Sequence, residues 1–112
     1  MTGPDPEVSV QQAADAAAAG LVLLVDVRED EEWAAGRAPG AIHARLSSLR
    51  ADDVPGDRPV VAVCRSGNRS GKAAAQLAQA GLRVSNMAGG MTAWAAAGLP
   101  VVRDDGSPGE IA

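Results

Sequence analysis

Apolar and polar stretches alternate along the chain in short blocks. The blocks at residues 21–27 and 60–63 consist of Val, Leu and Ala, with Asp26 as the one polar residue. Such runs are typical of parallel strands that helices cover on both faces. Two further strands are expected at residues 41–44 and 83–87, so the pattern predicts a sheet of short strands.

The blocks between these strands are rich in helix-forming residues. Ser9 and Gln12 have the spacing of a capping box, and the Ala-rich run that follows ends at Gly20. Further stop signals stand at Gly36, Gly81 and Gly98. Helices are therefore predicted over 11–19, 30–35, 70–80 and 91–97, with a helical turn at 47–50, a surface loop at 51–59 and a flexible polar tail at 104–112.

Helices that alternate with short strands indicate an α/β fold with a mainly parallel sheet. The 112 residues fit one domain. We place it at residues 8–103, between an N-terminal extension at 1–7 and the tail at 104–112. Ligands of such sheets bind beyond the carboxyl ends of the strands. Cys64 stands at such an end, directly after the strand at 60–63.

The composition narrows the class of protein. Apolar residues make up 46% and charged residues 21% of the chain, which is typical of a soluble globular protein. A single Cys and a single His exclude a disulfide framework and the usual metal sites, so no metal and no cofactor are expected. No signal peptide or membrane-spanning run is recognised, which predicts a cytoplasmic location without membrane contact.

The distribution of charge suggests what the protein binds. A net charge of -4 argues against a nucleic-acid partner. Between Asp57 and Asp104 there is no acidic residue, although six cationic residues fall in this stretch. The densest cluster, Arg65, Arg69 and Lys72, surrounds Cys64. A small anionic substrate is therefore expected near the cysteine.

The loop at 64–69 has the composition of an anion cradle. Gly67 gives the backbone the freedom to turn successive N–H groups inward, and the following helix adds its positive N-terminal end. Guanidinium groups suit a tetrahedral oxyanion. The same surroundings are expected to lower the pKa of the Cys64 thiol and make it a nucleophile. The candidate substrate-binding residues are Arg65, Ser66, Gly67, Asn68, Arg69 and Ser70.

Other functions fit the composition of this loop less well. A lone Cys after a Val-rich strand is more often an inert core residue, but the flanking Arg, Ser, Gly and Asn favour chemistry. A phosphate-binding P-loop does not fit, because the glycines at 67 and 71 are too close and Ala73 lacks a hydroxyl. Cysteine phosphatases do not fit either, because Ser70 occupies the place of their Arg. No second Cys supports a thioredoxin-like mechanism.

Four stretches in this order and spacing resemble the single-domain rhodaneses, or thiosulfate sulfurtransferases. The resemblance covers residues 8–101. It is carried by residues 24–29 with Glu32 and Trp33, by 36–42, by 63–70, and by 87–94 running on to 98–100. The chain departs from the family pattern at Arg37, Ala38 and Trp33, for which we expect altered packing with the chemistry retained.

The resemblance implies a three-layer fold, in which a mainly parallel central sheet is flanked by helices, and a function. Cys64 would accept a sulfane sulfur from thiosulfate or a related persulfide donor, and the resulting persulfide would pass it to cyanide or a thiol. Two alternatives on the same fold stay open. One is a persulfide carrier for a dedicated acceptor protein, and the other is a non-catalytic regulatory or interaction module.

Residues outside the loop are expected to have mainly structural roles. Asp26 and Arg28 follow the first strand, and we expect them to form ion pairs with neighbours such as Glu32 or Arg69, with substrate contact as the alternative. His43 is expected to be structural. The two Trp residues are interpreted as core residues, with Trp33 as an alternative wall of the pocket, and residues 89–90 as a turn.

Overall fold

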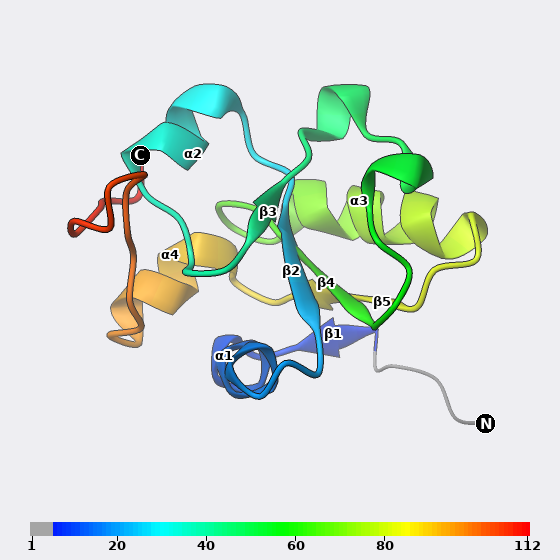
Figure 1. The fold of residues 1–112 in the computed structure, drawn as a ribbon, viewed down its shortest axis with the longest axis horizontal. Coiled ribbons are helices and arrows are strands. Elements are labelled where there is room, and N and C mark those ends of the chain that lie inside the picture. Colours follow the sequence, from blue (N-terminus) through cyan, green and yellow to red (C-terminus); the bar gives the residue numbers. More distant parts are fainter. Residues whose placement is uncertain (1–5) are drawn as a thin grey trace.

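The computed structural model describes residues 6–112 and contains one parallel sheet between two layers of helices (Figure 1). The strands are β1 (Glu7–Val8), β2 (Leu23–Asp26), β3 (Ile42–His43), β4 (Val60–Val63) and β5 (Val84–Met87). The α-helices are α1 (Val10–Ala18), α2 (Asp30–Ala35), α3 (Asn68–Gln79) and α4 (Gly90–Ala96), and short 3-10 turns cover Leu46–Ser48 and Ala51–Asp53. The strand order is β1-β5-β4-β2-β3, and every pairing is parallel. The predicted α/β fold with a parallel central sheet is confirmed.

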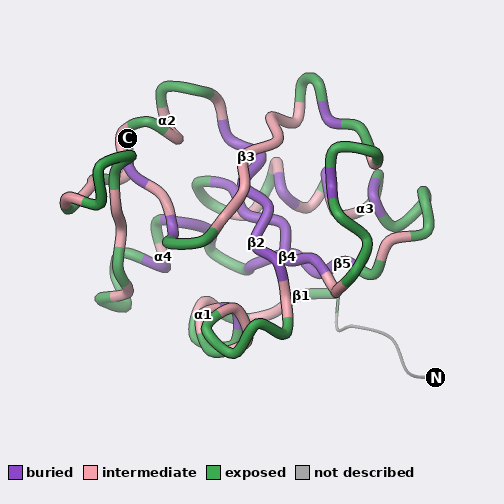
Figure 2. Tube along the Cα trace, viewed as in Figure 1, coloured by how far each residue is buried: buried purple, intermediate pink, exposed green. Residues whose placement is uncertain are grey.

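The central strands β2 and β4 are buried along their whole length, as Figure 2 shows. Successive side chains of a strand point to opposite faces of a sheet, so each strand supplies two hydrophobic clusters. Leu23, Val25, Val60 and Ala62 pack with Ala73 and Leu77 of α3. Leu24, Val61 and Val63 pack with Ala13 of α1 and with Met91 and Trp94 of α4. Burial on both faces explains why these strands lack a polar alternation.

The helix boundaries confirm some sequence signals and correct others. The capping box is present, because Ser9 Oγ accepts from the Gln12 N–H and Gln12 Oε1 accepts from the Ser9 N–H. Helix α3 begins at Asn68 instead of Ser70. Gly67 has a φ of 104° and ends the loop there, which a residue with a Cβ would do only under strain. The free loop is thus shorter than predicted.

The N-terminal strand β1 was not predicted, because two residues carry too little pattern. Glu7 and Val8 pair with Asn86 and Met87 of β5. The expected extension at 1–7 therefore overlaps this strand at Glu7, and residues 1–5 lie outside the described residues. No helix within residues 6–112 is long and apolar enough to cross a membrane.

The C-terminal segment, predicted as a flexible tail, folds back on the domain. The Glu110 N–H donates to the Ala35 carbonyl at 2.9 Å, and Asp104 pairs with Arg37. Ile111 packs against the cluster that contains Trp94. The backbone approaches so closely that a Cβ on Gly36 would lie 2.5 Å from the Glu110 carbonyl oxygen. The division of the chain at residue 103 stays a prediction.

Candidate active site

Cys64 follows β4 at the carboxyl edge of the sheet, and its side chain is buried. The Gly67 N–H donates to Cys64 Sγ at 3.0 Å, and Ser70 Oγ lies 3.2 Å from the same sulfur. The loop therefore curls around the sulfur as a small nest of donors. Of the predicted substrate-binding residues, Gly67 and Ser70 contact the sulfur directly, whereas Ser66 and Asn68 are exposed.

The surroundings of the sulfur determine its ionisation. Burial acts to raise the pKa of the Cys64 thiol, and hydrogen bonds from the Ser70 hydroxyl and from the N–H groups of Ser70, Gly67 and Ser66 act to lower it. The hydrogen bonds outweigh the burial, so the pKa is lowered from its usual value of 9.0. The surroundings therefore shift the equilibrium of Cys64 toward the thiolate, which is the nucleophilic form.

The turn before α4 holds the loop in place. The N–H groups of Met91 and Thr92 donate to the Cys64 and Arg65 carbonyl oxygens at 2.8 and 2.9 Å. Gly90 has a φ of 57°, and a Cβ there would lie 2.4 Å from the Cys64 carbonyl oxygen. The residues at 89–90 were predicted only as a turn. The structure shows that the turn also contacts the loop, and that the N–H groups in the first turn of α4 donate to the backbone of the Cys64 loop.

Asn86 on β5 belongs to the site, although the sequence did not identify it. Its Oδ1 lies 2.5 Å from Ser70 Oγ, and its Nδ2 donates to the Gly67 carbonyl at 3.1 Å and to Glu7 Oε2 at 3.3 Å. These two acceptors fix which end of the amide faces Ser70, so Asn86 Oδ1 and Cys64 Sγ share the single hydroxyl proton of Ser70. The available signal was a polar residue within a strand that is buried throughout.

The two loop arginines point to different partners. Arg69 Nη1 and Nη2 donate to Glu32 Oε1 and Oε2 at 2.6 and 2.8 Å. This pairing lowers the pKa of Glu32 to about 2 and raises the pKa of Arg69. Arg65 is exposed, and its Nε donates to the Ala112 carbonyl oxygen at 2.9 Å. Arg69 therefore lies at the rim of the nest with its charge balanced.

Asp26 and Arg28 pair with each other, so the predicted partners Glu32 and Arg69 were wrong. Both side chains are fully buried, and Arg28 Nη2 donates to Asp26 Oδ2 and to the Gly36 carbonyl, each at 2.7 Å. The two residues are near neighbours in sequence, and the chain bends after β2 so that the guanidinium folds back on the carboxylate. Neither side chain reaches solvent, and the pair connects the end of β2 to the Gly36 carbonyl.

Comparison with known proteins identifies the family. A family model described as a rhodanese-like domain matches residues 9–97. This chain belongs to the rhodanese-like domain family. It is 48% identical over 88 residues to a sulfurtransferase of Allochromatium vinosum, over 76% of this chain and 82% of that protein. It is 43% identical to an HTH-type transcriptional regulator of Mycobacterium tuberculosis, over 80% of this chain but only 41% of the regulator.

A solved structure agrees with this assignment. The crystal structure of a rhodanese-related protein from Thermoplasma volcanium superposes with a TM-score of 0.81 at 27% identity, and the match covers 88% of this chain and 98% of that one. The predicted family and its fold are confirmed. The relatives named as sulfurtransferases support a role in sulfur transfer.

Two of the residues that depart from the usual rhodanese pattern, Trp33 and Arg37, form a stack with His43, whereas Ala38 is buried in the core. The Trp33 and His43 rings lie parallel with their centroids 4.7 Å apart, and the Arg37 guanidinium carbon lies 4.3 Å from the Trp33 ring centre. His43 Nε2 is 2.7 Å from the Arg28 carbonyl oxygen. Trp33 thus packs from α2 against His43 of β3, and His43 connects the stack to the backbone of Arg28.

A separate cavity of about 500 Å³ lies away from Cys64. It is lined by residues of α1, by the start of β2, and by Trp94, Leu99 and Pro100. None of the residues 64–70 lines it. In addition, no group of three or more His, Cys, Asp or Glu side chains within residues 6–112 is placed to hold a metal ion. The cavity and the nest at Cys64 are therefore separate features of the domain.

Proposed function

We propose that the protein is a sulfurtransferase that carries sulfane sulfur as a persulfide on Cys64. The donor is thiosulfate or a related persulfide, and the acceptor is cyanide or a thiol. The observation that carries this proposal is the nest at Cys64 Sγ, in which the Gly67 N–H and the Ser70 hydroxyl lie 3.0 and 3.2 Å from the sulfur. Membership of the rhodanese-like family and the sulfurtransferase relatives support it.

The reaction proceeds by two displacements. The Cys64 thiolate attacks the outer sulfur of thiosulfate, a new S–S bond forms, and the bond to the sulfonate breaks so that sulfite leaves with the bonding electron pair. Cyanide or a thiolate then attacks the outer sulfur of the persulfide, and the Cys64 thiolate leaves. Both states of the enzyme place negative charge on sulfur, and the N–H donors of the nest stabilise that charge in each of them.

The nest also suits sulfur better than phosphate. Only Ser66 and Gly67 separate the Cys64–Arg65 backbone, which α4 holds, from the start of α3 at Asn68. A short loop around a buried sulfur suits a small terminal atom better than a phosphate group. Ser70, where cysteine phosphatases need an arginine, contacts the sulfur itself at 3.2 Å. This arrangement favours transfer of a single sulfur atom.

A regulatory module is the second candidate function, because a rhodanese-like relative forms part of a protein named as a transcriptional regulator. A carrier that serves one acceptor protein is a variant of the first function, and we place either form in the cytoplasm, where a lone thiol stays reduced. A dedicated carrier would transfer sulfur to thiols much faster than to cyanide. A module without catalysis would not load sulfur at all.

The deciding experiment is the intact mass of the protein after incubation with thiosulfate or a low-molecular-weight persulfide. We expect the mass to rise by about 32 Da, one sulfur atom, and to return to its original value when cyanide is added and thiocyanate is released. Cys64→Ser should show no adduct while its thermal unfolding stays close to that of the wild type. No adduct with either donor would overturn the proposed function and favour the regulatory module.

A further inference from the structure

Glu32 stands out among the residues near Cys64 because it places a fixed negative charge at the rim of an anion-binding nest. It projects from α2, and its carboxylate accepts three hydrogen bonds: the Glu29 N–H at 3.0 Å and the two Arg69 donors at 2.6 and 2.8 Å. Only 17% of its side chain is exposed. A carboxylate held in this way keeps its position when a substrate arrives.

The electrostatic consequence concerns Arg69. This residue ends the sequence motif of the loop, and the Cys64 thiolate is among the charges that act on it, after Glu32. Its guanidinium retains three N–H donors that do not contact Glu32. Its positive charge, however, is balanced by a carboxylate less than 3 Å away. Glu29 adds a second, weaker negative contribution at Arg69.

Donors of sulfane sulfur differ in how much they gain from a positive rim. Thiosulfate carries two negative charges, and its sulfonate group must lie outside the sulfur that Cys64 attacks. An alkyl persulfide made from an uncharged thiol carries at most one negative charge, and that charge is on the sulfur atom to be transferred. A balanced Arg69 therefore weakens the binding of thiosulfate more than the binding of the persulfide.

We propose that Glu32 determines donor specificity, and that its pairing with Arg69 directs the site toward low-molecular-weight alkyl persulfides and away from thiosulfate. The proposal rests on the sulfur transfer proposed above. In the preferred reaction the Cys64 thiolate attacks the outer sulfur of RS–SH, the RS–S bond breaks, and RS⁻ leaves with the electron pair. The outer sulfur keeps its proton during the transfer, so the first products are Cys64–S–SH and RS⁻; the persulfide then gives up that proton and RS⁻ takes one up, which leaves the anionic persulfide and RSH.

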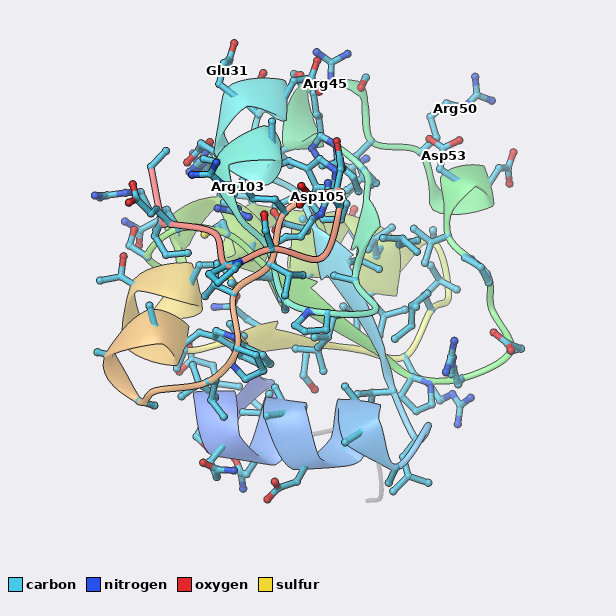
Figure 3. The ribbon with its side chains drawn as sticks, turned by 60° about the vertical axis from the view of Figure 1, so that its left-hand side comes forward. Glu31, Arg45, Arg50, Asp53, Arg103 and Asp105 are labelled. Carbon is cyan, nitrogen blue, oxygen red and sulfur yellow. The ribbon has the colours of Figure 1, made fainter. Side chains whose placement is uncertain are left out.

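The charge of Glu32 persists under all working conditions, because the Arg69 hydrogen bonds hold its pKa at about 2. Only substitution removes it. The same helix offers a matched control in Glu31, which is exposed and points away from the body of the domain (Figure 3). Within the described residues its side chain makes no ion pair or hydrogen bond. Glu31→Gln and Glu32→Gln therefore change the net charge equally.

The test compares kcat/KM for thiosulfate and for the persulfide of 2-mercaptoethanol, with cyanide as acceptor. We expect Glu32→Gln to raise kcat/KM for thiosulfate at least about fivefold, mainly through KM, and to change the value for the persulfide less than about twofold. Glu31→Gln should leave both values near those of the wild type. A fall for thiosulfate alone would overturn the proposal, since Glu32 would then hold Arg69 in an anion-binding position.

A second variant keeps the proposal open to test if Glu32→Gln does not fold. Arg69→Ala leaves the Glu32 carboxylate unbalanced, so kcat/KM for thiosulfate should fall at least about tenfold and that for the persulfide less than about threefold. Equal losses for both donors in either variant would overturn the proposal and assign the pair to loop stability. If neither donor loads sulfur onto wild-type Cys64, the proposed function itself fails, and this inference with it.

Discussion

Two neighbouring strand ends at the carboxyl edge of the sheet differ in how their charged groups are partnered. Asp26 at the end of β2 and Arg28 in the loop that follows neutralise each other in full burial. The loop after β4 contains Cys64 and directs its backbone N–H groups and the Ser70 hydroxyl at one sulfur atom. Both strands are four residues long, fully buried and hydrogen-bonded to each other. The same scaffold thus supports a closed ion pair at one strand end and a reactive group at the next.

The difference lies in whether the charged group of each loop forms an ion pair within that loop. In the loop after β2 the carboxylate accepts from the Arg28 backbone N–H as well as from its guanidinium. In the loop after β4 the donors converge on a sulfur atom, and the cation on which its charge acts, Arg69, is already paired with Glu32. A buried charge that is paired within its own loop makes that loop rigid. N–H donors that are directed at a sulfur atom can instead stabilise the negative charge that forms on it.

The largest effect is expected from removing one partner of the buried Asp26–Arg28 ion pair. Arg28→Met leaves the Asp26 carboxylate buried without its partner and should lower the free energy of unfolding by about 3–5 kcal/mol. The loss should appear in urea unfolding followed by circular dichroism. Arg69→Met is the matched control, because its partly exposed pair with Glu32 should contribute no more than about 1 kcal/mol. Similar losses for both variants would contradict the distinction between the two loops.

A smaller effect is expected from disturbing the turn that holds the reactive loop. Gly90→Ala puts a Cβ 2.4 Å from the Cys64 carbonyl oxygen at a φ of 57°, and we expect a loss of about 2–4 kcal/mol in the free energy of unfolding, with a larger loss of sulfur transfer. Gly98→Ala is the control, since its φ of 76° is similar but nothing lies within 4 Å of its Cβ position. That variant should lose only about 1 kcal/mol and keep its activity. Equal losses in both would show that the contact with the loop is unimportant.

The smallest effect concerns one hydrogen bond to the sulfur. The reactive form is the thiolate, so activity should fall as the pH drops through the pKa of Cys64. Ser70→Ala removes a hydrogen bond that lowers this pKa, so the acid limb of the pH profile of kcat/KM should move to higher pH. On that limb the rate should fall about two- to tenfold. Ser66→Ala should leave the limb in place, because the Ser66 side chain is exposed and only its N–H acts on the sulfur. An unchanged profile for Ser70→Ala would show that its hydroxyl does not stabilise the thiolate.

Much of the local structure could be predicted from the sequence. The strands at 60–63 and 83–87, the acidic helix at 30–35 and the cap at Ser9 lie within one residue of their expected places. The position of Cys64 at a strand end also followed from the pattern, as did the family. The two-residue strand β1 and the folded-back C-terminal segment did not, because short extended segments carry no periodicity and are held by contacts with distant residues.

The sequence by itself determined the alternation of helices and strands and the placing of one cysteine between β4 and α3, because hydrophobic periodicity and glycine stop signals act over a few neighbouring residues. Only the tertiary structure decided which charges meet. Arg69 pairs with a carboxylate 37 positions away, Asn86 reaches the loop through Ser70, and α4 supplies donors to the Cys64 and Arg65 carbonyls. Hydrogen bonds and ion pairs require atoms to lie within about 3 Å, and that separation is set by the packing of whole elements.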